Sequence, residues 1–355
     1  MDNVQCYQKI VAKLTWATQQ LGKDIEPTEL ENIGNLVWQT LEGKWRYFHT
    51  SKHILEVAED NSPIAVLAAI FHDIVYVQVD ECIPFNLTRY ISPFIIQTSD
   101  GSYQIKSANQ LSIDSVFSLI SKVFGYDVGE TLDPNSGQNE FLSAVVAGSI
   151  LKHWLPKEII WQIAACIEAT IPFRPDFERS RQASSVYGRV ICAQKNPIER
   201  LYERLIATNQ EFGFGYTEAK LVDIVHLCVN LANRDLQGFN SQKSEVFLDN
   251  TWDLLLESNH HLCDRDSHTI AEYRIALGKN YYFLQNFLQP SLIFNQFQGQ
   301  PEKAVYERWI IQAKNNLNLA RLYLGSQLVA TLIVESICGK FAPQMTLSTI
   351  VGQSC

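Results

Sequence analysis

The sequence predicts an all-α fold. Apolar residues recur at three- and four-residue intervals over most of the 355 residues, which is the period of an amphipathic helix. Hydrophobic residues make up 46% of the chain and charged residues 19%, so the chain can fill a large core and is ordered. Segments rich in β-branched and aromatic residues, such as YISPFIIQT, gather in a short region near 80–110.

The N-terminal half contains four expected helices. Periodicity places them at 4–21, 28–41, 50–60 and in the run PIAVLAAIF, where Pro63 takes the first helical position that proline favours. Thr28 is expected to cap the second helix, with Glu31 completing a capping box. Residues 80–138 are expected to form an insert, irregular or with short β-strands, that also holds a helix at 112–124.

The remaining helices are expected at 140–151, 156–170, 184–209, 217–233, 243–258 and 268–288, followed by a long last helix at 302–338. Residues 289–303 are rich in Pro, Gly and Gln, which indicates a linker. We therefore expect a helical domain over 1–288, a linker over 289–303 and a C-terminal part over 304–355. That part is expected to pack on the body or to form an interface in a homo-oligomer.

The bulk composition limits the class of protein. A formal net charge of -9 argues against non-specific binding to nucleic acid or to an anionic membrane, but it allows a phosphorylated ligand in a locally positive pocket. The N-terminus lacks the pattern of a signal peptide, and no run reaches the roughly 18 apolar residues of a membrane span. The 8 cysteines form no CxxC pair and fit reduced core thiols. We expect a soluble, cytoplasmic protein.

Three short elements carry metal-binding residue types. His49 and His53 are four residues apart, so on a helix they would share a face. His72 and Asp73 end an apolar helix, where an unpaired charge would cost roughly several kcal/mol and a divalent metal would remove that cost. Asp235 ends another apolar helix. Taken singly, each element is better explained by packed histidines, a local salt bridge or a helix-end aspartate.

Together, the segments FHTSKHI, AAIFHDIVY and NRDL resemble the HD superfamily of metal-dependent phosphohydrolases, and most closely a group of bacterial predicted HD phosphohydrolases. The match covers about residues 44–80, with a short match at 233–236. The resemblance implies an all-α HD-domain helical bundle and a divalent metal ion (Mn, Mg, Co, Ni, Zn or Fe).

The resemblance also implies roles for single residues. His53, His72, Asp73 and Asp235 would bind the metal, and Asp73 would thereby take part in catalysis. His49 would act as the general acid that protonates the leaving oxygen. This chemistry is consistent with a metal that lowers the pKa of bound water and with a histidine one helical turn away.

Cations near the motif could hold a phosphate, and the candidates are Lys52, Arg46 and Arg234, although each is also typical of an ordinary surface charge. Two departures from the family pattern stand out. The chain reads VQVDECIPFN after HDIVY instead of an Asn-Glu-Glu-rich segment, and no histidine follows Thr170, where relatives often have one. These departures argue against a second metal site but leave the number of metal ions open; Glu168 could replace that histidine but is expected at the surface of its helix.

The expected function is hydrolysis of a nucleotide or another small phosphoester by metal-activated water. One alternative is an HD-type diiron oxygenase, which needs further histidine ligands between Asp73 and Asp235. The chain has only His153 and His226 in that interval, and neither lies in a recognisable motif. The other alternative is a non-catalytic HD module that senses a nucleotide or builds an assembly.

Overall fold

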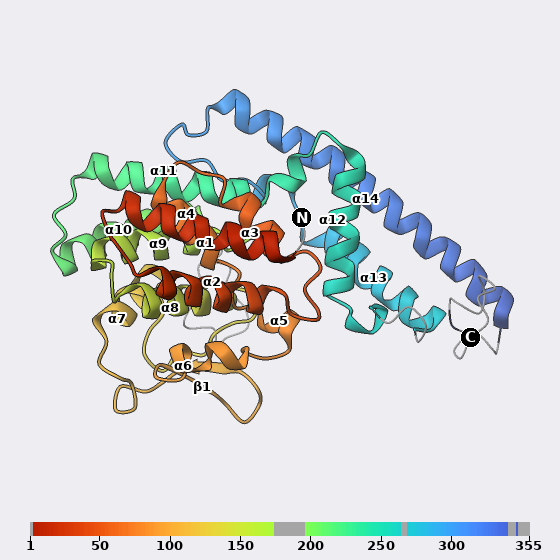
Figure 1. Cartoon of the computed structure of the whole chain (residues 1–355). Coiled ribbons are helices and arrows are strands. Elements are labelled where there is room, and N and C mark those ends of the chain that lie inside the picture. The colour runs from red at the N-terminus through yellow and green to blue at the C-terminus, as the bar shows by residue number, and fades with distance from the viewer. Residues whose placement is uncertain (1–2, 174–195, 264–267, 340–345, 347–355) are drawn as a thin grey trace, which may run out of the picture.

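The computed structural model describes residues 3–173, 196–263, 268–339 and 346, and they form an all-α fold, as the sequence predicts (Figure 1). The helices in this part of the chain are α1 (Asn3–Gln20), α2 (Pro27–Leu41), α3 (Ser51–Val57), α4 (Pro63–Phe71), α5 (Val77–Asp80), α6 (Thr88–Ile91), α7 (Ser115–Phe124), α8 (Gln138–Leu151), α9 (Lys157–Ala169), α10 (Pro197–Phe212), α11 (Glu218–Asp235), α12 (Ser244–Glu257), α13 (Ile270–Asn286) and α14 (Lys303–Cys338).

Helix α4 lies at the centre of the larger part of the molecule. Its residues 65–71 are all 0% exposed, and it packs against α1, α3, α8, α9 and α11. A helix that is covered on every side has no need of a polar face, which explains the wholly apolar run PIAVLAAIF. Ser62 caps its N-terminus by accepting a hydrogen bond from the N–H of Ala65, and Pro63 occupies the first turn. Both its start and its end therefore follow the sequence pattern.

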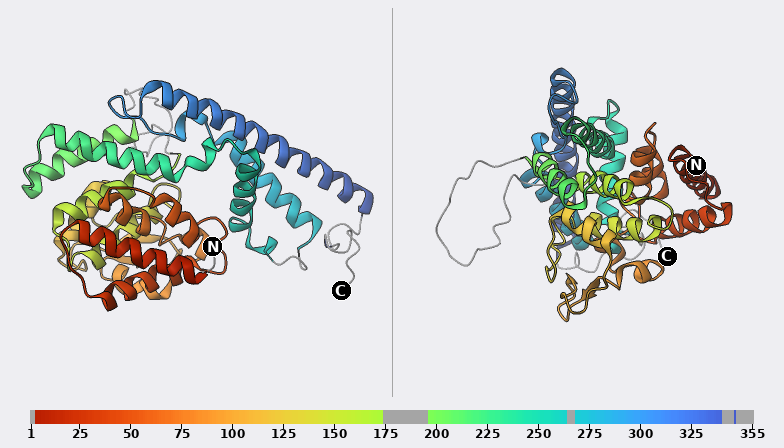
Figure 2. Two further views of the ribbon diagram at one scale, coloured as in Figure 1. Left: turned by 45° about the horizontal axis from the view of Figure 1, so that its top comes forward. Right: turned by 90° about the vertical axis from the view of Figure 1, so that its left-hand side faces the viewer.

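The apolar residues form two clusters. The first is built mainly from α1–α11, and the second is built mainly from α12, α13 and α14 (Figure 2). Residues 289–303 join them, because Phe297 packs in the first cluster while Ile293 and Phe294 pack in the second. The division of the chain at 288 and 303 into domain, linker and C-terminal part stays a prediction.

The insert at 80–138 holds the short strands of the described chain. Strands β1 (Ile95–Gln97) and β2 (Tyr103–Ile105) pair antiparallel, with Ile95 opposite Ile105. The expected cap at Thr28 is wrong, because α2 already begins at Pro27 and the preceding residue makes no side-chain cap bond. The proline starts the helix one residue earlier. The first part of the helix expected at 184–209 lies outside the described residues.

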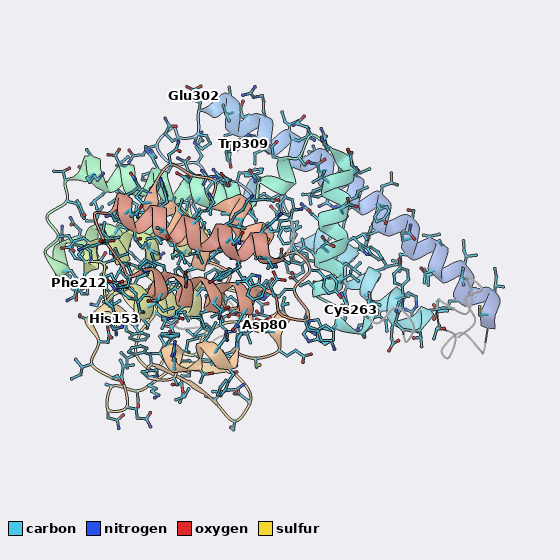
Figure 3. The ribbon with its side chains drawn as sticks, viewed as in Figure 1. Asp80, His153, Phe212, Cys263, Glu302 and Trp309 are labelled. Carbon is cyan, nitrogen blue, oxygen red and sulfur yellow. The ribbon has the colours of Figure 1, made fainter. Side chains whose placement is uncertain are left out.

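Helix α14 is the longest described element. It begins after Glu302, passes Trp309 at one edge of the molecule, and extends along α13 beyond the body (Figures 1 and 3). By length and composition alone, it is the one helix in the described part of the chain that could cross a membrane. The cytoplasmic location stays a prediction.

Candidate metal centre

Three helices bring four metal-binding side chains to one point. His53 lies in α3, His72 and Asp73 follow the last residue of α4, and Asp235 is the last residue of α11. Their ligand atoms all lie within 4.8 Å of one another. The Nε2 atom of His72 is 2.9 Å from Oδ2 of Asp73, and Nε2 of His53 is 3.0 Å from Oδ1 of Asp235. The structure thus gathers all four residues that the sequence singled out as metal ligands.

The His72 imidazole is held in the tautomer that a metal ligand needs. Its Nδ1 lies 2.7 Å from the carbonyl oxygen of Ala69. Because a carbonyl can only accept, Nδ1 must carry a proton there. That bond orients the ring and leaves Nε2 facing Asp73 and Asp235. The segment after Asp73 is fixed as well, since the N–H of Val75 donates to the Ser143 hydroxyl at 3.1 Å.

The local charges favour a cation. Burial alone would lower the pKa of His72, but the carboxylates of Asp73 and Asp235 raise it well above its ordinary value. Burial would raise the pKa of Asp73, but His72 and His49 hold it well below its ordinary value. The C-terminal ends of α4 and α11, which carry partial negative charge, also meet here. Two carboxylates and two helix ends therefore face one point between two imidazoles.

His49 does not lie on a helix with His53, contrary to the sequence interpretation. Helix α3 begins only at Ser51, with Thr50 at its N-cap, so His49 belongs to the preceding turn. The two rings still lie near each other, with centroids 5.7 Å apart. The turn forms because Glu257 of α12 binds it: the carboxylate oxygen Oε1 accepts from the N–H groups of Tyr47, Phe48 and His49 at 3.0–3.3 Å.

Glu257 also sets the charge of His49. Its second oxygen, Oε2, lies 2.6 Å from Nδ1 of His49, and the Glu257 side chain is 2% exposed. Burial alone would lower the pKa of His49, but the carboxylates of Glu257 and Asp73 raise it above its ordinary value. The Tyr76 ring packs against the His49 ring with centroids 4.6 Å apart, and burial raises the pKa of its phenol. The carboxylates of Glu257 and Asp73 thus favour the protonated form of the His49 imidazole next to the candidate metal ligands.

No pattern in the sequence pointed to Glu257. It lies in the last turn of α12, in the sequence DLLLES, and no spacing links it to His49 across the intervening chain. The only available signal was an acidic residue next to a leucine run, at a position that the helical pattern can also place at the surface. Its role depends on the tertiary packing of α12 on the turn at 46–49.

The sequence suggested that Arg46 could hold a phosphate, but its guanidinium is buried and bonded within the protein. Its side chain is 0% exposed and its guanidinium forms two bonds with the carboxylate of Asp80, at 3.0 and 2.6 Å. It also donates to the carbonyl oxygens of His49, Asp73 and Ile74. These bonds use all five donors of the guanidinium, which anchors the segments on both sides of the site.

The other two candidate cations differ in exposure. Arg234 pairs with Asp60 and donates to the carbonyl of Val57, so it ties α11 to the end of α3. Lys52 is 67% exposed and lies 4.0 Å from Glu56, which leaves its ammonium group free to turn toward a ligand. Of the three, Lys52 has the most exposed charge, and its ammonium group lies beside Glu56 on α3.

The sequence suggested that Glu168 lies at the surface of its helix, but this expectation is wrong. It is 1% exposed and forms an ion pair with Arg204 of α10. Arg204 also donates from Nε to the carbonyl of Val123 at 2.6 Å. The carboxylate is buried because this arginine compensates its charge. Glu168 is absent from the group of metal-binding side chains that the described residues form.

Comparisons with known proteins add no assignment: no family model, no curated protein and no solved structure matches the chain.

Proposed function

We propose that the chain is a metal-dependent phosphohydrolase of the HD type that acts on a nucleotide or another small phosphoester. The observation that carries the proposal is the meeting of His53, His72, Asp73 and Asp235 at one point, with His49 and its buried partner Glu257 beside them. These are the residues that the resemblance to HD phosphohydrolases singles out.

The donor set fits a divalent transition metal or magnesium. Two imidazole nitrogens and two carboxylate oxygens supply the mixed ligands that Mn, Fe, Co, Ni and Zn accept, and the carboxylates also suit Mg. The metal would polarise a phosphoryl oxygen and lower the pKa of bound water. The Ala69 carbonyl holds the His72 ring, so the protein fixes this ligand before any ion binds.

His49 would act as the general acid, and its raised pKa supports this role. Its Nδ1 is held by Glu257, which leaves Nε2 as the nitrogen that can give a proton to the leaving alkoxide. The Glu257 carboxylate raises the pKa of His49 and so favours its protonated form, and the same carboxylate binds the N–H groups of the turn at 47–49. Lys52 is the accessible cation that would attract the phosphate group.

The test compares two aspartates of the same helix. Asp235→Asn removes a ligand at the end of α11, whereas Asp223→Asn makes the same change at an exposed position on α11. We expect the wild type and the Asp223 variant to bind a divalent ion and to hydrolyse bis(p-nitrophenyl) phosphate or members of a nucleotide panel. The Asp235 variant should stay folded, lose the metal and lose hydrolysis.

Other outcomes would contradict the proposal. Two irons per chain with oxygen consumption would identify the oxygenase alternative. Bound metal with no turnover of any phosphoester in the panel would favour a non-catalytic sensing or assembly module. A protein that binds no metal even after soaking in each of the six ions would remove the chemical basis of the proposal.

A further inference from the structure

Tyr76 lies beside the candidate metal centre, directly before α5. Its ring packs against the ring of His49, with centroids 4.6 Å apart at an angle of 74°. Ile74 and Val75, which precede it, are 0% exposed, whereas Tyr76 is partly exposed. Of these three residues, Tyr76 is therefore the one that a bound ligand can reach.

The backbone on both sides of Tyr76 is fixed by hydrogen bonds. The N–H of Val75 donates to the hydroxyl of Ser143 at 3.1 Å. The N–H of Val77 donates to the side-chain carbonyl of Asn139 at 3.0 Å, and both acceptors belong to α8. The carbonyl oxygen of Tyr76 itself accepts from two N–H groups of α5, at 3.1 and 2.9 Å. Because the backbone is held and the ring is packed, the direction of the phenol is set before a ligand binds.

The hydroxyl group of Tyr76 has no hydrogen-bond partner among the described residues. By contrast, the hydroxyl groups of Tyr126 and Tyr306 donate to backbone carbonyls at 2.9 and 3.3 Å. A phenol in a confined position usually finds such a partner. The free donor of Tyr76, next to the candidate metal ligands, is therefore available to a ligand.

The Tyr76 phenol keeps its proton at neutral pH. Burial raises the pKa of the phenol, and the carboxylates of Glu257, Asp73 and Glu140 raise it further. The protonated phenol offers one O–H donor. A ligand that pairs with this donor must consequently bring an acceptor oxygen to the metal centre.

A phosphoryl group needs more donors than the cations near the centre offer. It carries several non-bridging oxygens, of which the metal would polarise one. Arg46 donates all its N–H groups within the protein, and Arg234 pairs with Asp60. Lys52 is exposed and carries its charge on a flexible stem. In the part of the chain that the structure describes, the Tyr76 hydroxyl is thus a fixed donor that is still free.

We propose that the hydroxyl group of Tyr76 donates a hydrogen bond to a non-bridging oxygen of a phosphoryl group bound at the metal centre. The inference rests on the proposed function, because it assigns a binding residue to the same site. The two rings that touch would then serve different oxygens. His49 would protonate the oxygen that leaves, and Tyr76 would hold an oxygen that stays on phosphorus.

The test replaces Tyr76 by phenylalanine, which removes the hydroxyl and keeps the ring that packs on His49. Tyr282→Phe makes the same change at a position on α13 that is 60% exposed. Binding of inorganic phosphate to the metal-loaded proteins is measured by titration calorimetry. Because a hydrogen bond to a charged oxygen is lost, the Kd for phosphate should rise roughly tenfold to hundredfold in Tyr76→Phe. It should stay unchanged in Tyr282→Phe.

Three further readouts separate substrate binding from a structural role. Metal content and circular dichroism should be equal in the wild type and both variants. On a phosphoester, Tyr76→Phe should lower kcat/KM by a factor similar to its loss of phosphate affinity. The alkaline limb of kcat should stay where the wild type has it, because Glu257 still holds His49.

Equal phosphate affinity in the wild type and Tyr76→Phe would overturn the inference, and so would a wild type that binds no phosphate. Loss of metal from Tyr76→Phe, or a shift of its alkaline limb to lower pH, would also overturn it, because the hydroxyl would then act through the ligands or through His49. The proposed function fails separately. A wild type that binds phosphate through Tyr76 but hydrolyses no phosphoester would contradict hydrolysis and support the inference.

Discussion

Glu257→Gln should separate acid catalysis from metal binding. The substitution keeps an oxygen that can accept from the N–H groups of the turn at 47–49, but it removes the negative charge next to His49. Glu257 is not among the metal-binding side chains. We therefore expect bound metal to remain and proton donation to weaken.

The size of the effect follows from the geometry. A hydrogen bond to a charged group contributes about 1.5–3 kcal/mol, and the bond between Glu257 and His49 is short and almost fully buried. At about 1.4 kcal/mol per factor of ten, its loss should lower kcat by roughly tenfold to hundredfold. Removal of the acid itself in His49→Gln should cost more, roughly 10²–10⁴-fold.

The leaving group is the decisive variable in the assay. A p-nitrophenolate leaves without a proton, whereas an alkoxide or a nucleoside hydroxyl needs one. Both variants should therefore lose far more activity on a phosphoester with a poor leaving group than on a p-nitrophenyl ester. Equal losses on both substrates, or loss of the metal from Glu257→Gln, would refute the role assigned to this pair.

The pH dependence of kcat should also differ between the wild type and Glu257→Gln, and the direction of the difference can be predicted. The pKa of His49 is raised, so the protonated acid persists to higher pH than for an ordinary histidine. Without the Glu257 carboxylate, the alkaline limb of kcat should move to lower pH. The ion pair also stabilises the fold below the ordinary pKa of histidine, and this contribution fades as the pH rises through the raised pKa.

Two further predictions concern stability. Arg46→Met leaves the Asp80 carboxylate unpaired at 11% exposure and should lower the free energy of unfolding by about 3–5 kcal/mol, measured by urea denaturation; a loss under about 1 kcal/mol would contradict the anchoring role. Asp114 caps α7 and pairs with Lys152, and although burial raises its pKa, these contacts hold it below its ordinary value. Asp114→Ala should cost about 0.5–2 kcal/mol at neutral pH, and the difference from wild type should shrink as the pH falls through the lowered pKa; a pH-independent difference would contradict this account.

Periodicity predicts the helices well because each one buries an apolar face. The helix expected at 217–233 runs over Glu218–Asp235, and the apolar run after Ser62 forms the central helix α4. The first residues of the helices were predicted less well, because a single residue can determine where a helix begins. Pro27 begins α2 before Thr28 can cap it, and Ser51 begins α3 after His49.

The four candidate metal ligands could be named from the sequence because the three segments together resemble the HD phosphohydrolases, whereas each segment alone is better explained without a metal. In the structure, His72 and Asp73 follow the last residue of α4 and Asp235 is the last residue of α11, so two apolar helices end at the same point. The burial of Arg46 could not be predicted in this way. It depends on Asp80 of α5, which lies beside Arg46 only because the chain turns back after α4.

The four candidate metal ligands and the carboxylate that contacts His49 lie in different parts of the chain. Helices α3, α4 and α11 hold the four ligands, whereas Glu257 of α12 comes from the second apolar cluster. Without α12, the N–H groups of Tyr47, Phe48 and His49 would lose their shared acceptor, and the imidazole would lose its carboxylate. The four ligands would keep their helix ends. If His49 acts as the proposed acid, the second apolar cluster supplies its carboxylate partner, although every residue of the recognisable motif lies outside that cluster.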